Sequence, residues 1–215
     1  MTTLSAVFFG LFAVAALVDW YAVSRDRGEG RVTLEYVAKP LTLAFLTAAC
    51  ASLHDVDPTA KAWFVVALVF GLAGDLFLLV PDRYFVAGLA SFLIGHLAYV
   101  VGFLVQPVEV VGLVAGALVV IAGLAVIGRP IVSAVSEEEP KLLAPVVAYI
   151  GVISAMVVVA TGSLIPVAIA GGLLFFASDA LIAWSKFVDP REWMRLGIIT
   201  TYHLGQLGLV LSLLA

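Results

Sequence analysis

Two apolar stretches, each containing one aspartate, decide how this sequence is interpreted. Residues 62–80 read AWFVVALVFGLAGDLFLLV, and residues 164–184 read LIPVAIAGGLLFFASDALIAW. Each stretch is long enough to cross a bilayer core, which takes roughly 20 helical residues. A carboxylate near the middle of such a helix costs at least about 2.5–3.5 kcal/mol on insertion scales, so it is rarely there without a function. We therefore predict two membrane-spanning helices with functional carboxylates, Asp75 and Asp179.

The composition of the whole chain indicates a polytopic membrane protein. Its 215 residues are 63% hydrophobic and 12% charged, whereas a soluble domain is about half apolar and a quarter charged. We predict an all-α bundle, with residues 1–215 forming a single transmembrane domain and no room for a soluble one. Dividing the chain at its polar breaks predicts eight spans, at about 4–23, 32–53, 62–80, 84–105, 110–128, 142–160, 164–184 and 196–214.

Basic residues in the connections predict the orientation of the chain. The connections after odd-numbered spans hold nine basic residues, and those after even-numbered spans hold only Lys61. Lys and Arg accumulate in cytoplasmic loops, so we expect the odd connections in the cytoplasm and both termini outside. We expect an integral protein of the inner or plasma membrane. The nine residues are Arg25, Arg27, Arg31, Arg83, Arg129, Lys141, Lys186, Arg191 and Arg195.

Most polar residues inside the spans lie at one depth. Their distance from the nearest basic residue of an odd connection is six to eight positions, or roughly 9–12 Å along a helix axis. His96 is deeper, at thirteen positions from Arg83. The shared depth predicts one polar pocket that opens to the cytoplasmic leaflet. The residues of this layer are Asp19, Lys39, Asp75, Asp179, Tyr202 and His203.

Simpler structural explanations exist for several of these residues. Asp19 and Glu35 lie near helix ends and could meet loop arginines, and Glu35 could pair with Lys39 four positions later. Lys39 could also form a purely structural ion pair with Asp75 or Asp179, although one lysine cannot neutralise both.

The histidines are ambiguous in the same way. His96 is as readily a hydrogen-bonded structural residue as a ligand, and it shares a helix face with Tyr99, as Tyr202 does with Gln206. His203 points about 100° away from Tyr202 on a helix. No spacing typical of a metal site is present, and we expect neither a metal nor a cofactor.

Several short motifs resemble the YhhN family of membrane lysoplasmalogenases. They follow one another in order through nearly the whole chain, and their order, spacing and eight-span setting together carry the resemblance. The motifs are Ala38-Lys39-Pro40-Leu41, Gly74-Asp75 with Phe77-Leu78-Leu79, Phe92 with Gly95-His96-Leu97-Ala98-Tyr99, Phe175 with Ser178-Asp179, and Tyr202 with Gln206.

The resemblance implies a hydrolase that cleaves the vinyl ether bond of lysoplasmalogens into a fatty aldehyde and a glycerophospho-choline or -ethanolamine. Acid–base catalysis by two carboxyl groups, as in glycosidases, suits this reaction. We therefore expect Asp75 and Asp179 to be catalytic, with a slight preference for Asp179 as the acid. The expected substrate-binding residues are Lys39, His96, Tyr99, Ser178, Tyr202 and Gln206.

The expected partner is a lysophospholipid from the surrounding membrane lipids, and no nucleic acid is expected. Its phosphate would lie near Arg31, Arg83 or Arg195. A proton-coupled carrier that uses the same buried charges is the main alternative, although carrier sites usually lie near the midplane. A retinal-binding photoreceptor would need Lys39 as its Schiff-base residue and is a remote alternative.

Overall fold

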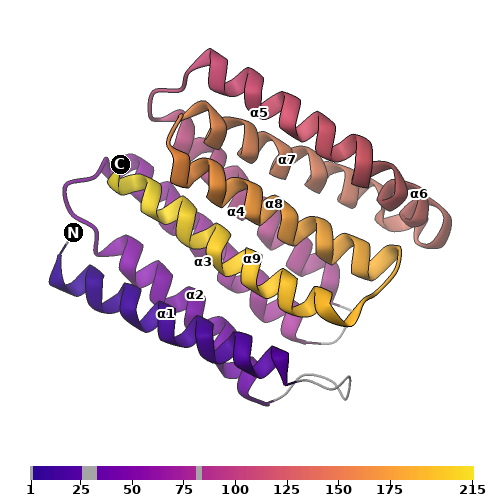
Figure 1. The fold of residues 1–215 in the computed structure, drawn as a ribbon, viewed down its shortest axis with the longest axis horizontal. Coiled ribbons are helices and arrows are strands. Elements are labelled where there is room, and N and C mark those ends of the chain that lie inside the picture. Colours follow the sequence, from indigo (N-terminus) through magenta and orange to yellow (C-terminus); the bar gives the residue numbers. More distant parts are fainter. Residues whose placement is uncertain (1, 26–32, 81–83) are drawn as a thin grey trace.

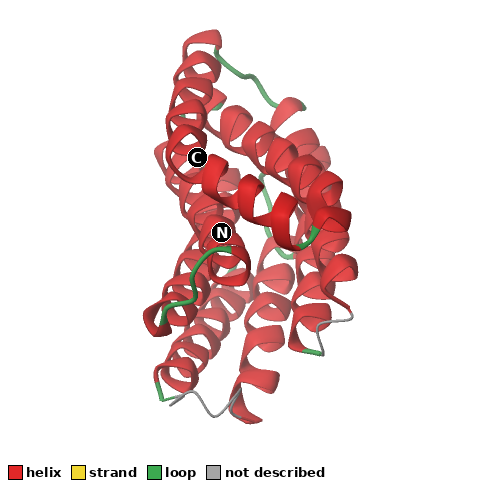
Figure 2. Ribbon diagram, turned by 90° about the vertical axis from the view of Figure 1, so that its right-hand side faces the viewer, coloured by secondary structure: helices red, strands yellow, loops and turns green. Residues whose placement is uncertain are grey.

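The computed structural model describes residues 2–25, 33–80 and 84–215, and every regular element in these ranges is a helix (Figures 1 and 2). Three basic residues used to predict the orientation, Arg27, Arg31 and Arg83, lie outside these ranges. The helices are α1 (Thr3–Ser24), α2 (Thr33–Ala51), α3 (Pro58–Leu79), α4 (Phe85–Leu104), α5 (Val110–Gly123), the π-helix η2 (Leu124–Gly128), α6 (Arg129–Glu138), the short η3 (Pro140–Leu142), α7 (Leu143–Gly162), α8 (Pro166–Phe187), α9 (Glu192–Leu211) and the short η4 (Ser212–Leu214).

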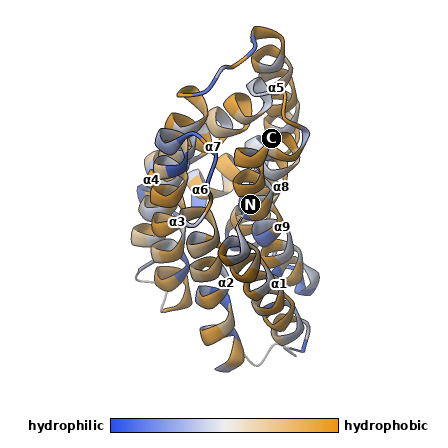
Figure 3. Ribbon diagram, turned by 90° about the vertical axis from the view of Figure 1, so that its left-hand side faces the viewer, coloured by the Kyte–Doolittle hydropathy of each residue, from blue (hydrophilic) through white to orange (hydrophobic). Residues whose placement is uncertain are grey.

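Within the described residues, eight helical stretches are long and apolar enough to cross a membrane. This confirms the predicted all-α fold of eight spans. The helices are built mostly of hydrophobic residues (Figure 3), and many large hydrophobic side chains are exposed; on α5 Leu118 and Ile121 are each 63% exposed. Such a surface is suited to lipid and not to water. The chain is an integral membrane protein.

The fifth span differs from the sequence-based expectation. It continues without a break from Val110 to Glu138, whereas the sequence predicts a span at 110–128 followed by a polar connection. The extension is helical because Ile131 and Val135, four residues apart, are buried against α7 and α8. Pro130 has no N–H to donate to the preceding turn, and the widened π-turn η2 ends two residues before it, at Gly128.

The spans pack mainly as hairpins, in which α1 pairs with α2, α3 with α4, α5 with α7, and α8 with α9. The span that contains α9 is the most enclosed, and the one that contains α5 and α6 is the most exposed. Figure 1 shows α9 between α8 and the α1–α2 hairpin, with both ends of the chain at the same end of the bundle. The last long helix therefore meets residues from both halves of the chain.

Glycine allows the very close approach of α8 and α9. A Cβ atom at Gly171 would lie 2.7 Å from the backbone nitrogen of Leu209, and one at Gly205 would lie 2.8 Å from that of Phe175. Small residues at such contacts let helix backbones touch, which is a common way to pack helices in membranes. The contact holds α8 directly against α9.

Candidate active site

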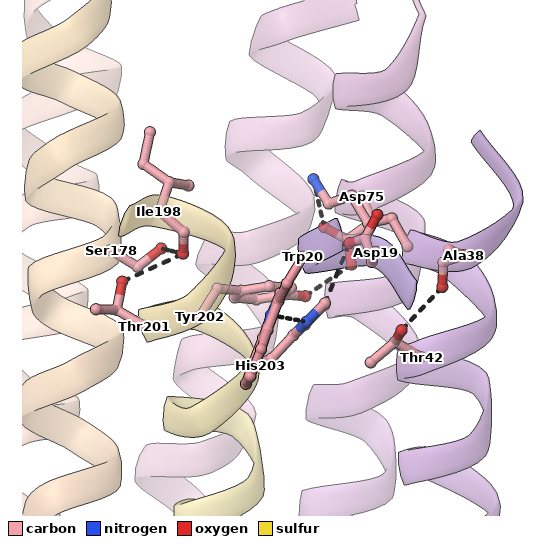
Figure 4. A network of polar contacts seen from close by, with 11 residues as sticks. Asp19, Trp20, Ala38, Thr42, Asp75, Ser178, Ile198, Thr201, Tyr202 and His203 are labelled. Carbon is pink, nitrogen blue, oxygen red and sulfur yellow. Dashed lines mark hydrogen bonds and ion pairs between the residues drawn. The ribbon is translucent and has the colours of Figure 1, made fainter. Parts of the chain in front are cut away.

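The first polar cluster is centred on the buried carboxylate of Asp75 on α3. Lys39 on α2 places its Nζ 3.1 Å from Oδ1 of Asp75. The hydroxyl of Tyr202 on α9 donates to Oδ2 over 2.8 Å (Figure 4). The cluster therefore pairs the charge of Asp75 with a cation and a hydrogen bond, which offsets part of the cost of placing it in the bilayer.

Next to this cluster lies a second buried carboxylate, Asp19 on α1. His203 accepts a hydrogen bond at Nδ1 from the indole of Trp20 over 3.1 Å, so the hydrogen of its neutral ring is on Nε2. This Nε2 lies 3.9 Å from Oδ2 of Asp19, and neither Asp19 oxygen has a hydrogen-bond partner among the described residues (Figure 4). Asp19 is fully buried and does not lie at the surface.

Glu35 on α2 and Arg195 on α9 link these two helices. They form an ion pair with 2.8 Å between Arg195 Nη2 and Glu35 Oε2. Glu35 thus pairs with an arginine of α9, one of the two simple explanations that the sequence allowed for it. Arg195, which the sequence suggested for the lipid phosphate, has its guanidinium engaged at this site.

A separate polar cluster surrounds Asp179 on α8. The hydroxyl of Tyr149 on α7 donates to Oδ2 of Asp179 over 2.6 Å. Nε2 of His96 on α4 lies 3.1 Å from the same oxygen and 3.0 Å from the Tyr149 hydroxyl. Both neighbours thus hold Oδ2, and among the described residues no hydrogen bond engages Oδ1. That second oxygen remains available to a bound molecule.

Asp179 lies in the wall of an apolar pocket between α4, α7, α8 and the α5–α6 span. The pocket holds about 750 Å³ of space, part of it open to the surroundings. Among its described lining residues Asp179 is the one charged group, and Tyr149 supplies a hydroxyl. The remainder of the lining is aliphatic or aromatic, with Phe92, Phe176 and Phe187 among its rings. Such a pocket suits a hydrocarbon chain that carries one reactive polar bond.

The two aspartates therefore belong to separate clusters, and Asp75 is not part of the pocket lining. Aromatic rings connect them: the ring centroids of Tyr202 and Phe175 are 5.3 Å apart, and those of Phe175 and His96 are 4.6 Å apart. Both contacts have edge-to-face geometry, which is a favoured arrangement of aromatic pairs. A substitution in the Asp75 cluster can therefore affect the Asp179 cluster through the packing of these rings.

The remaining predicted residues lie outside the pocket lining. Tyr99 donates a hydrogen bond to the side-chain oxygen of Gln206, and both residues are buried. Ser178 donates to the backbone carbonyl of Ile198 over 3.1 Å and so ties α8 to α9. The structure thus unites Lys39, Asp75 and Tyr202 in one cluster and Asp179 with His96 in the other.

Tyr149 was missed by the sequence reasoning, although it makes the shortest hydrogen bond to Asp179. The signal that could have revealed it is its depth. Tyr149 lies eight positions after Lys141, the same separation as between Arg31 and Lys39. Applying the depth count to span 142–160 would have placed Tyr149 in the polar layer.

The fold and the site define a polytopic membrane protein with a partly buried carboxyl group in the wall of an apolar pocket. This chain belongs to the YhhN family, whose model matches residues 34–213. The match confirms the family that the sequence motifs suggested. No solved structure matches the chain.

The chain is also similar to proteins named lysoplasmalogenases. Human lysoplasmalogenase TMEM86B is 37% identical over 152 residues, which cover 69% of this chain and 62% of that protein. Human TMEM86A is 33% identical, covering 72% and 66%, and the lysoplasmalogenase of Mycobacterium tuberculosis (strain CDC 1551 / Oshkosh) is 30% identical, covering 75% and 63%. The matches thus span slightly less than two thirds of these relatives. Their names give no support to a carrier.

Proposed function

We propose that this protein is a lysoplasmalogenase, which hydrolyses the vinyl ether bond of lysophospholipids taken from the bilayer. The products would be a fatty aldehyde and a glycerophospho-choline or -ethanolamine. The observation that carries the proposal is the position of Asp179, whose carboxyl group meets an otherwise apolar pocket and is held there by Tyr149 and His96. The names of the related proteins support the same reaction.

In the proposed reaction the protonated carboxyl group of Asp179 donates its proton to the alkene carbon farther from the ether oxygen. The electrons of the double bond form the new C–H bond, and the neighbouring carbon becomes part of an oxocarbenium ion. Water then attacks this carbon and gives a proton to the Asp179 carboxylate. The hemiacetal breaks its bond to the glycerol oxygen, its hydroxyl proton passes to that oxygen, and the aldehyde is released. One water is consumed and Asp179 is restored.

Tyr149 and His96 would stabilise the carboxylate in this cycle. Both approach Oδ2 of Asp179, so negative charge that develops on proton transfer meets existing hydrogen-bond donors. Donors already oriented toward developing charge are a large source of catalysis. The free Oδ1 is then the oxygen that exchanges the proton with substrate and water.

Asp75 takes a positioning role in this proposal. Its oxygens are engaged by Lys39 and Tyr202, and the ring of Tyr202 packs against Phe175, which packs in turn against His96. The ion pair thereby holds the aromatic wall behind His96. The sequence analysis expected Asp75 to be catalytic; its place outside the pocket lining favours action through packing instead.

The decisive experiment compares Asp179→Asn with Asp189→Asn on a panel of vinyl ether, alkyl ether and acyl lysolipids, with products identified by mass spectrometry. Asparagine keeps the shape but cannot deliver the proton. Acid–base catalysis is worth typically 10²–10⁴-fold, so Asp179→Asn should lose about 100-fold or more. Asp189, paired with Arg191 at the surface, should tolerate the change. An active, folded Asp179→Asn variant would remove Asp179 from the mechanism.

We propose that the protein lies in the inner or plasma membrane with both termini outside. The basic residues of the odd connections support this orientation, which would place the Lys186 end of α8 at the cytoplasmic surface. Ser136→Cys and Thr59→Cys should then react with impermeant thiol reagents from opposite sides, because both positions are exposed and Cys50 is buried. If position 136 is labelled only from outside, the orientation is the opposite of the proposed one.

A further inference from the structure

A lysine lies at the rim of the apolar pocket. Nζ of Lys186 lies 4.4 Å from the ring centroid of Phe85 and 5.9 Å from that of Phe187. Both rings line the pocket and contact each other edge to face. Lys186 is exposed, and among the described residues no carboxylate pairs with it. Its ammonium is thus held at the rim by aromatic faces and is available to an anion.

Lys186 and Asp179 lie on one face of α8. They are seven residues apart, which corresponds to two helical turns, or roughly 10.5 Å along the axis. Between them, Ile182 and Ala183 belong to the same pocket lining. A molecule lying along this face would therefore meet first the ammonium, then an apolar strip, and then the carboxyl group.

A lysophospholipid with a vinyl ether chain has the same order of groups. Seven bonds separate its phosphorus from the alkene carbon that takes the proton, which is roughly 8–9 Å at the rise per bond of an extended chain. A phosphate on Lys186 would place that carbon near Asp179, given the reach of the lysine side chain. The adjoining hydrocarbon would then lie among the deeper pocket residues, such as Ile153 and Phe176.

We infer that Lys186 binds the phosphate of the lysophospholipid and thereby sets the register that brings the vinyl ether to Asp179. This inference rests on the proposed function. The ligand is a phosphodiester whose two sources, a lipid head group or a free phosphate compound, share the same anionic oxygens. Arg129, in an open hollow that shares Leu124, Gly128 and Ile150 with the pocket, is the competing anchor.

The test measures kcat/KM on two substrates, a vinyl ether lysophosphatidylethanolamine and the matching alkenylglycerol without phosphate. Lys186→Glu should lower kcat/KM for the phospholipid about tenfold or more and leave that for the neutral substrate within about threefold. Lys186→Arg should retain most of the activity. Lys141→Glu, at an exposed lysine outside the pocket lining, and Arg129→Glu should resemble wild type on both substrates.

Equal losses on both substrates would mean a structural role for Lys186, and a selective loss in Arg129→Glu would assign the phosphate to Arg129; either result overturns the inference. A binding assay tests the inference separately from the proposed function. It uses tryptophan fluorescence to measure binding of a non-hydrolysable alkyl ether lysophospholipid. If wild type cleaves neither substrate but its binding still depends on Lys186, only the proposed function fails. Inorganic phosphate or glycerophosphoethanolamine should not displace the lysophospholipid at concentrations similar to its own. If either compound does, the ligand is a free phosphate and the lipid assignment is overturned.

Discussion

Replacing Tyr149 by phenylalanine tests the proposed chemistry with the smallest possible change. The substitution removes one hydroxyl, which donates to Asp179 over 2.6 Å. The ring stays, and with it the edge-to-face contact with His96 at 5.4 Å between centroids. A hydrogen bond to a charged group contributes about 1.5–3 kcal/mol. Since about 1.4 kcal/mol of barrier is a factor of ten, kcat should fall about 10- to 150-fold.

The assay is release of fatty aldehyde from a vinyl ether lysophosphatidylethanolamine in detergent micelles, followed by mass spectrometry at saturating substrate. KM should stay within about threefold, because the hydroxyl acts on the charge that forms at Asp179 and not on the bound lipid. Asp179→Asn supplies the lower limit of activity, and thermal denaturation of each variant shows whether it is folded.

Tyr99→Phe is the matched control. Tyr99 is also buried, but its hydroxyl donates to the neutral amide of Gln206, outside the pocket lining. The control should keep kcat within about threefold of wild type. The reasoning is refuted if Tyr149→Phe keeps full activity. It is also refuted if both variants lose activity to the same extent, because removing any buried hydroxyl would then explain the loss.

Two further predictions concern stability, measured by thermal denaturation in detergent. Gly171→Ala should destabilise the protein by about 1–3 kcal/mol, as overpacking typically does, because its Cβ would meet backbone atoms of α9. The control Gly151→Ala should be neutral, because nothing lies within 4 Å of its Cβ. Similar melting temperatures for the two variants would contradict the close contact of α8 and α9. Asp75→Asn should cost about 3–5 kcal/mol, the usual effect of breaking a buried ion pair, and adding Lys39→Met should recover much of it. Additive losses would show that the 3.1 Å pair is not energetically coupled.

The membrane spans could be predicted because length and polarity are local properties of the chain. The apolar residues 62–80 predict a span, and α3 covers most of them. The helix begins earlier, at Pro58, because the Asp57 side chain accepts from the backbone N–H groups of Thr59 and Ala60. This cap satisfies the polar helix end beyond the apolar core, so apolar counting alone could not place the start.

The arrangement within the polar layer could not be predicted in the same way. Counting residues gives depth along each helix but neither its rotation nor its neighbours. Asp75 and Asp179 share a depth, yet one faces Lys39 across α2 and α3 and the other faces Tyr149 across α7 and α8. The separation depends on which helices touch, and that is a property of the whole bundle.

The enclosed position of α9 constrains the order in which the bundle can form during synthesis. Tyr202 follows its partner Asp75 by 127 positions, and His203 follows Trp20 by 183. At a synthesis rate of about 5–20 residues per second, Tyr202 is made roughly 6–25 seconds after Asp75. During that time Lys39, on the neighbouring helix, can already pair with it. The ion pair can thus offset part of the cost of the buried charge of Asp75 until α9 is made.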